Sequence, residues 1–338
     1  MKIVIATPLY PPEIAEPALY IKELAHRLCE KHDVQVIAYT KQKQVETCPQ
    51  VIPVDKRAPL IIRLFNFTGA LWKASKAADY IFAESALASA IPAMAIGYVR
   101  RIPVMLHVRE DEIGNRIQRR QLKDALGFKL RCMYLGQRWI MHRAQVCVFP
   151  HQILAHDIQQ KHGLTPSQMQ IILNPASKKP LLPFPIEKKP HDILVANEEL
   201  TEAEFKLIMQ AIERLSSSIA DIRCVPLQGM AQAEMWYALQ SAGAVLIPKI
   251  KGDVEITNAY AAGIPLIAVN SPIVTEAVKD GVSGVVIAEL RADLIERAIV
   301  SVCTDEMLRN TLQDGAKQEL QKYTWENHLA KLNRLFSI

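Results

Sequence analysis

Strand-like apolar runs alternate with helical patterns along this chain of 338 residues, and that rhythm limits its fold more than any other feature. Lys2–Thr7 is a strand-like run that ends at a proline-rich loop, and Ala18–Lys31 follows with leucines at near-helical spacing. Four further strand-like runs continue the series: Asp33–Thr40, Tyr80–Ala83, Pro103–Val108 and Gln145–Pro150. This alternation predicts an α/β fold in which helices cover both faces of a parallel sheet.

A segment rich in proline and lysine interrupts the series. Residues 174–192 read NPASKKPLLPFPIEKKPHD, with five prolines and four lysines, a composition typical of a hinge. A second strand and helix series follows: Ile193–Ala196, Glu202–Leu215, Arg223–Leu227, Met235–Ala242, Ala244–Pro248, Asn258–Ala262, Pro265–Val269 and Gly284–Ile287. We therefore predict two Rossmann-like domains, over 1–173 and 192–324, joined by a linker over 174–191. Ligands bind at the carboxyl ends of such strands, so facing domains would hold a site in the cleft between them.

Composition narrows the class of protein. Half of the residues are hydrophobic and 22% are charged, which is typical of a chain with a sizeable core. The best candidate for a membrane span, Tyr80–Val99, contains Glu84 and Pro92, so a buried strand and helix is favoured there. The six cysteines are scattered with no C-x-x-C pair, which argues against a metal site or a disulfide framework. A reducing cytoplasm fits this pattern.

The net charge of +5 is unevenly distributed. Between Arg116 and Arg143, eight Lys or Arg stand against one acid, Asp124, so this segment carries +7 and the remainder −2. Apolar side chains, including Leu130 and Trp139, lie between these charges, as in helices that bind anionic lipid as peripheral membrane segments. A solvated helix face is the alternative. No nucleic-acid-binding motif accompanies the charge, so a nucleic-acid partner is not expected.

Four stretches of the sequence carry a resemblance to a known family. They are TPLYPPEIAEP with VQVIAYT near the N-terminus, NAYAAGIPLIAVNSPIVTEAVKDGVSG in the second half, and the closing YTWENHLAKLNRLF. The chain resembles the glycosyltransferase family 4 group, which has the GT-B fold. The resemblance implies two Rossmann-like domains facing across a cleft, with the last helix, 325–338, crossing back onto the first domain. It also implies a nucleotide-sugar donor used as a substrate, no cofactor or required metal, and retention of anomeric configuration.

Several donor-site features of that family are altered here. Where its members carry two glycines beside a phosphate, this chain has Ala15 and Glu16. Ala15 allows fewer backbone conformations than glycine, and the carboxylate of Glu16 would repel an anion. Glu198 and Ala203 stand where the family has an Arg and a Lys for the diphosphate. Asn258 replaces a glutamate that would hold the ribose hydroxyls, and it retains hydrogen-bonding capacity.

Other donor-side residues are kept or replaced. Glu276 matches a family glutamate, and Gly281 and Gly284 match its DGxxG turn, although a turn alone would also explain both glycines. The segment Ser271, Pro272 and Ile273 stands where the family has small residues, ahead of a helix whose amides could meet an anion. Lys249 and Lys251, in PKIKGD at a strand end, are the predicted replacement cations for the diphosphate, and Lys206 on a nearby helix is the alternative.

On the first-domain side, His107 closes a buried strand in LHVREDE. The resemblance implies a place near the acceptor and the reacting sugar, and a structural histidine is the alternative. Asp111 follows in a loop where a carboxylate could bind a sugar hydroxyl or act as a base. Arg109 could pair with an acidic acceptor. His107 and Asp111 are therefore the predicted catalytic pair, with no metal ligands expected among the histidines.

Two main functions remain open from the sequence, beside another GT-B activity such as that of an epimerase or a phosphorylase. The first is an active hexosyltransferase that moves a sugar from its donor to a saccharide or lipid-linked acceptor in surface polysaccharide biosynthesis. The second is a catalytically degenerate GT-B protein that binds a saccharide or serves as a partner subunit. The altered residues at 198, 203 and 258 favour the degenerate protein, and the lysines of PKIKGD favour the active transferase.

Overall fold

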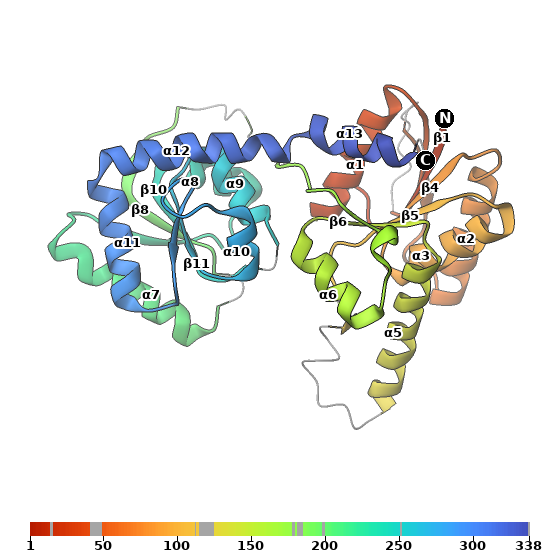
Figure 1. Ribbon diagram of the computed structural model, residues 1–338, viewed down its shortest axis with the longest axis horizontal. Coiled ribbons are helices and arrows are strands. Elements are labelled where there is room, and N and C mark those ends of the chain that lie inside the picture. The colour runs from red at the N-terminus through yellow and green to blue at the C-terminus, as the bar shows by residue number, and fades with distance from the viewer. Residues whose placement is uncertain are drawn as a thin grey trace. The chain divides into compact units, whose positions relative to one another are not determined.

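The computed structural model describes residues 1–13, 16–40, 49–111, 113–114, 125–177, 180, 185–197, 200–250 and 252–336 (Figure 1). The chain divides into two compact units, Met1–Ile172 and Leu173–Ile338, and each contains its own sheet. The final helix, α13 (Trp325–Phe336), is counted with the second unit, where His328 Nδ1 lies 2.8 Å from the carbonyl oxygen of Leu173. The predicted packing of this helix on the first domain stays a prediction.

The first unit is built on a seven-stranded sheet in which every neighbouring pair is parallel, in the order β3-β2-β1-β4-β5-β6-β7. Its strands are β1 (Lys2–Thr7), β2 (Asp33–Tyr39), β3 (Gln50–Val54), β4 (Tyr80–Glu84), β5 (Val104–His107), β6 (Val146–Phe149) and β7 (Met169–Ile171). Its helices are α1 (Glu16–Cys29), α2 (Leu60–Ala74), α3 (Leu87–Arg100), α5 (Ala125–Arg143), α6 (Gln152–His162) and the 3₁₀ turn η1 (Pro166–Gln168). The central strands are buried along nearly their whole length because helices cover both faces.

Helices α2, α3, α5 and α6 lie beside the first unit's sheet in Figure 1. Their buried side chains share one hydrophobic core with that sheet. Helix α3 approaches β5 closely, since a Cβ at Gly97 would lie 2.3 Å from a methyl carbon of Val104. The stretch Tyr80–Val99 forms β4 and most of α3, which confirms the expected strand and helix: β4 is buried throughout, and α3 is buried in part. Within the described ranges, no helix combines the length and the apolar composition that a bilayer span requires.

The second unit has a five-stranded parallel sheet in the order β12-β11-β10-β8-β9. Its strands are β8 (Lys189–Val195), β9 (Arg223–Pro226), β10 (Ala242–Ile247), β11 (Leu266–Val269) and β12 (Val285–Ile287). Its helices before α13 are α7 (Glu202–Arg214), η2 (Leu215–Ser217), α8 (Gln232–Ser241), α9 (Val254–Ala262), α10 (Pro272–Ala277), α11 (Ala292–Thr304), α12 (Glu306–Leu320) and η3 (Gln321–Tyr323). Strand β8 begins at Lys189, inside the range predicted as linker.

Successive residues of β8 point into two different cores, as strand geometry requires. Ile193 and Val195 pack in the cluster that holds α7 and α11, whereas Leu194 packs in the cluster that holds α8 and α9. Helices therefore cover both faces of this sheet as well. Two such α/β units confirm the predicted fold class.

The cysteines depart in part from expectation. Cys29 is disulfide-bonded, while Cys132, Cys147, Cys224 and Cys303 are free thiols. The spacing of the cysteines along the chain does not predict this bond.

Candidate active site

Three polar residues meet at the carboxyl edge of the first unit's sheet. Strands β1, β4 and β5 are adjacent and parallel, and they end at Thr7, Glu84 and His107. Glu84 and His107 are register partners, and the hydroxyl of Thr7 is hydrogen-bonded to the Glu84 carboxyl group. All three side chains are buried. This edge is where parallel α/β sheets bind their ligands, so the fold places these groups where chemistry is expected.

Aromatic rings hold the imidazole of His107. Its ring centroid lies 5.1 Å from that of Tyr20 and 5.7 Å from that of Phe82. The guanidinium carbon of Arg109 lies 5.4 Å from the centroid of the same Tyr20 ring. His107 and Arg109 are thus brought together around Tyr20 of α1, and their proposed roles stay predictions.

Asp111 has a full set of contacts inside the first unit. One carboxylate oxygen accepts from the Gly114 amide at 3.0 Å and from Gln137 Nε2 at 3.2 Å, and the other lies 3.3 Å from Lys161 Nζ. His162 Nε2 lies 3.8 Å away. Burial alone would raise the pKa of Asp111, but its contacts with His162, Gly114 and Lys161 hold that pKa below its usual value.

These contacts tie the segment after β5 to α5 and α6. A side chain at position 114 would displace the Asp111 carboxylate, since a Cβ there would lie 1.9 Å from one of its oxygens. The structure therefore gives Asp111 a positioning role, and the predicted catalytic role is not needed to explain its burial. That catalytic role stays a prediction.

A pocket of about 840 Å³ opens in the first unit beside Glu84. Its walls come from the loop after β1, from α2 and α3, from the segment after β5, and from α5. Most lining residues are apolar: Leu9, Leu60, Leu64, Leu87, Ile91, Ile113 and Met133 are examples. The polar ones include Glu84, Arg109, Glu110, Lys129 and Gln137. This combination suits a ligand with an apolar body and a hydroxyl-bearing head.

At the carboxyl edge of the second unit's sheet, Lys249 follows β10 as predicted. Its ammonium nitrogen lies 2.7 Å from a carboxylate oxygen of Glu204 on α7. The same carboxylate accepts from the Thr201 amide at 2.9 Å, completing the capping box at the start of α7. The hydrogen bond from Lys249, with those from Thr201, lowers the pKa of Glu204 to about 2. Lys251 lies outside the described residues.

Asn258 lies on α9 with only 9% of its surface exposed. Within the described part of the chain, its amide oxygen accepts no hydrogen bond from the protein. A buried polar atom without a partner is costly, so this oxygen has unused capacity for a ligand's hydroxyl group. Glu276 on α10 is exposed.

The segment Ser271, Pro272 and Ile273 begins α10. The hydroxyl of Ser271 accepts from the amide of Val274 at 3.3 Å, and Pro272 has no amide hydrogen to offer. Fewer free amides therefore face an anion than the sequence suggests, and the predicted phosphate contact stays a prediction.

The two glycines of DGVSG serve a turn. Gly281 adopts a φ of 70°, which favours glycine, and Gly284 passes so close to Val278 that a Cβ would lie 2.7 Å from a methyl carbon. Ser283, between them, bonds the hydroxyl of Tyr260 at 2.9 Å. These contacts support the structural interpretation of both glycines.

Two further expectations concern phosphate and metal. Ala15 lies outside the described residues, and so does the side chain of Glu16, the first residue of α1. Across the described ranges, no three His, Cys, Asp or Glu side chains gather closely enough to share a metal ion. The predicted absence of a metal requirement stays a prediction.

Sequence reasoning did not assign Glu84 or Thr7 to the site. Glu84 served only as an argument against a membrane span. The available signal was a carboxylate that ends the otherwise apolar strand YIFAE, because the last residue of a parallel strand lies at the ligand-binding edge.

Comparison with known proteins agrees with this architecture. Residues 16–175 match the Glycosyl transferase 4-like domain, and residues 227–319 match Glycosyl transferases group 1. No curated protein sequence matches the chain.

Several solved structures share the fold at low identity. Sucrose-phosphate synthase from Thermosynechococcus elongatus is 14% identical with a TM-score of 0.70, over 100% of this chain and 98% of that one. Anabaena HepE, solved with UDP, is 12% identical with a TM-score of 0.70 over 100% of both chains. A glycosyltransferase from Rickettsia africae is 12% identical with a TM-score of 0.69, over 99% and 97% of the two chains. The chain therefore belongs to the family 4, group 1 glycosyltransferases, and its fold is that of the GT-B enzymes.

Proposed function

We propose that this protein transfers a sugar from a nucleotide-sugar donor to a lipid-linked acceptor in the biosynthesis of a surface polysaccharide. The pocket beside Glu84 supports a lipid-linked acceptor, because its walls are mainly apolar and it reaches the polar edge of the sheet. A saccharide head would place its hydroxyl groups near Glu84 and Arg109. An apolar chain would lie along Leu60, Leu64 and Ile91.

The second unit supplies the donor side of the proposal. Anabaena HepE was solved with UDP and with UDP-glucose, which supports a nucleotide sugar as the donor for a chain of the same fold. The unused amide oxygen of Asn258 suits a ribose hydroxyl, and Lys249 suits a phosphate once it leaves Glu204. Glu276, Lys251 and the 271–273 segment complete the proposed donor site. The nucleotide sugar is a substrate, and no metal or cofactor is needed.

We also propose that the protein works as a peripheral protein on the cytoplasmic face of an anionic membrane. Helices α2, α3 and α5 together contain seven Lys or Arg and no Asp or Glu. They also expose large apolar side chains, among them Ile61, Phe65, Tyr98 and Phe128. Cationic helices with exposed aromatic groups are suited to the surface of anionic lipid. Residues 116–124 of the predicted basic stretch lie outside the described residues.

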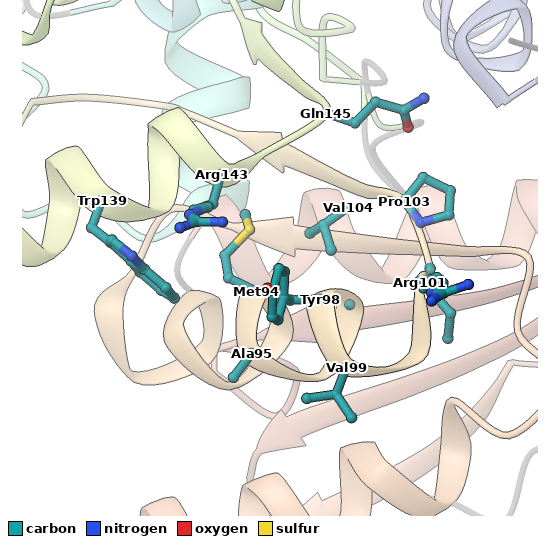
Figure 2. Close-up of a pocket in the computed structure, with 12 residues that line it drawn as sticks. Met94, Ala95, Tyr98, Val99, Arg101, Pro103, Val104, Trp139, Arg143 and Gln145 are labelled. Carbon is teal, nitrogen blue, oxygen red and sulfur yellow. The ribbon is translucent and has the colours of Figure 1, made fainter.

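Figure 2 shows a second pocket of the first unit, which is lined by residues of α3 and α5. Its volume is about 1020 Å³. Tyr98 and Val99 come from α3, and Trp139 and Arg143 come from α5. The guanidinium carbon of Arg143 lies 5.5 Å from the ring centroid of Tyr98. Aromatic rings beside guanidinium groups are typical of the membrane interface, so this pocket supports the membrane proposal.

The decisive experiment measures transfer by the purified full chain. UDP-, GDP- and dTDP-sugars would be incubated with octyl glycosides as amphiphilic acceptors and with the corresponding free sugars, and products identified by mass spectrometry. The proposal expects a glycosylated octyl glycoside with one class of nucleotide, and little product with free sugars. Nucleotide or octyl glycoside binding with no product would favour the degenerate, non-catalytic alternative.

A further inference from the structure

Glu84 is a carboxyl group that ends a buried strand and also lines the proposed acceptor pocket. It is 3% exposed, and it is the register partner of His107 on the neighbouring strand. A group that enters the pocket could therefore reach it. The same pocket contains Glu110, whose side chain is exposed, so two carboxylates of different burial face one cavity.

The surroundings of Glu84 bring its protonation equilibrium close to neutral pH. Burial raises the pKa of Glu84, the hydrogen bond with Thr7 offsets part of that rise, and the resulting pKa is about 7. The nearby titratable and charged groups are Tyr20 of α1, His107 of β5, Arg109 and Glu110 after β5, and Lys129 of α5. Glu84 can therefore change its protonation state within the physiological range, which an ordinary glutamate does not.

Thr7 gives both protonation states of Glu84 a partner. The Thr7 hydroxyl lies within hydrogen-bond distance of the Glu84 carboxyl and 2.8 Å from the carbonyl oxygen of Leu9. A hydroxyl group has a single proton, so it donates to one of these acceptors at a time. When Glu84 is ionised, Thr7 donates to it. When Glu84 is protonated, its own proton is donated to the Thr7 oxygen, and Thr7 donates to Leu9.

When Glu84 takes up a proton, the hydrogen bond between Thr7 and Glu84 reverses direction. Both the Thr7 hydroxyl and the new proton on Glu84 therefore keep a hydrogen-bond partner. That property distinguishes Glu84 from Asp111, whose carboxylate is fixed by donors that cannot reverse: an amide, a side-chain amide and an ammonium group. A group that receives a proton during a reaction needs such a reversible partner.

We propose that Glu84 accepts the proton of the acceptor hydroxyl during sugar transfer. The acceptor oxygen forms a bond to the anomeric carbon, and the bond from that carbon to the donor phosphate breaks. The electron pair of the broken bond leaves with the nucleoside diphosphate, and the hydroxyl proton moves to Glu84, which later releases it to water. This inference rests on the proposed function, because it requires an acceptor hydroxyl in the pocket.

The test compares pH–rate profiles of the unmodified protein, Glu84→Gln and Glu110→Gln, with an octyl glycoside acceptor and the nucleotide sugar it uses. The unmodified protein should gain activity as the pH rises through about 7. Glu84→Gln should have a kcat at least about a hundred-fold lower, and its activity should no longer rise with pH. Its Kd for the nucleotide should be unchanged. Glutamine retains the size and hydrogen bonds of a protonated Glu84, so a merely structural role would be rescued. Glu110→Gln should retain the rise.

The outcomes separate the two claims. Transfer by Glu84→Gln with an unchanged pH profile would overturn the role of Glu84 and leave the proposed function intact. An unmodified protein that binds the nucleotide sugar but transfers nothing would overturn both. A second variant, Thr7→Val, removes the hydroxyl that stabilises the ionised form, so its activity should rise at a higher pH than in the unmodified protein.

Discussion

The ammonium nitrogen of Lys249 lies 2.7 Å from a carboxylate oxygen of Glu204, so the cation predicted to hold the donor's diphosphate already has an anionic partner. Both side chains are partly exposed, and exposed ion pairs are weak. A phosphate group, with more charge and more acceptor oxygens than a carboxylate, can displace Glu204. If Lys249 holds the donor diphosphate as we propose, Glu204 competes with the donor for the same cation.

The first prediction follows from this competition. Glu204→Gln should bind UDP or the preferred nucleotide more tightly than the unmodified protein, and Lys249→Ala should bind it about ten- to a hundred-fold more weakly. Glutamine still completes a capping box, so α7 stays intact. Isothermal titration calorimetry measures both constants. Lys317→Ala is the control, because Lys317 is an exposed lysine paired with Asp314 on α12. Equal nucleotide affinities for all variants would show that Lys249 does not contact the donor.

The second prediction concerns His107. His107→Ala should lower kcat at least about a hundred-fold and leave the nucleotide Kd unchanged, because a group that contacts the reacting sugar stabilises the transition state. Truncation of a buried ring also leaves a cavity, so the melting temperature must be measured with the activity. Phe82→Leu is the control, since it disturbs the same aromatic cluster without removing the imidazole. Full activity of His107→Ala would place the catalytic groups elsewhere.

The third prediction separates two roles for Asp111. The sequence predicts that Asp111→Asn cuts transfer at least about a hundred-fold, while its contacts predict a loss of stability of about 1–3 kcal/mol from weakened charged hydrogen bonds. The folded pKa of Asp111 is lowered, so its stabilisation is present above pH 3.8 and lost as the pH falls through the folded value. Melting temperatures of both proteins should therefore converge in acid. A normal melting temperature with lost turnover would favour the catalytic role.

Much of the fold was accessible from the sequence, because buried parallel strands are continuous apolar runs. Strand β1 has the bounds predicted for it, and β2 ends one residue early. Strand β3 and helix α2 are among the elements that the sequence did not predict, together with β7, α11 and α12. β3 is a short edge strand that contains proline, and α2 exposes apolar residues such as Ile61, so neither has the usual pattern.

The site was less accessible, since its contacts join residues far apart in the chain. His107 could be placed at a strand end from local pattern alone. The partner of Asp111, Lys161, lies fifty residues away on α6, and Glu204 lies 45 residues before Lys249. No local pattern predicts that these charges meet. Glu84 was visible in the sequence, but its burial beside a pocket required the three-dimensional structure.

The fourth prediction concerns the membrane. Sedimentation with vesicles containing phosphatidylglycerol should carry the protein down, and added salt should release it, because exposed charges are screened over about 10 Å at 0.1 M. Arg138→Glu with Arg143→Glu on α5 should weaken binding at least about tenfold, since each cation near an anionic surface contributes about 1 kcal/mol. Lys317→Glu, on the second unit, should leave binding unchanged. Equal binding to phosphatidylcholine vesicles, insensitive to salt, would contradict an electrostatic contact.

The last prediction tests the buried state of Glu84 without any substrate. Its pKa rises from 4.5 in an exposed state to about 7 in the folded protein, so the folded protein binds an extra proton between these values. The stabilisation is complete below pH 4.5 and is lost as the pH rises through 7. A shift of this size corresponds to about 3 kcal/mol of unfolding free energy. Glu84→Gln cannot ionise, so its stability relative to the unmodified protein should increase by about that amount between pH 4.5 and 7.5, and then level off. Urea unfolding of both full chains at half-unit pH intervals measures the difference, and Glu110→Gln, exposed in the same pocket, should show no such trend. A stability difference that stays constant across this range would mean that Glu84 is ionised in the folded protein throughout, and would leave it no proton-accepting capacity near pH 7.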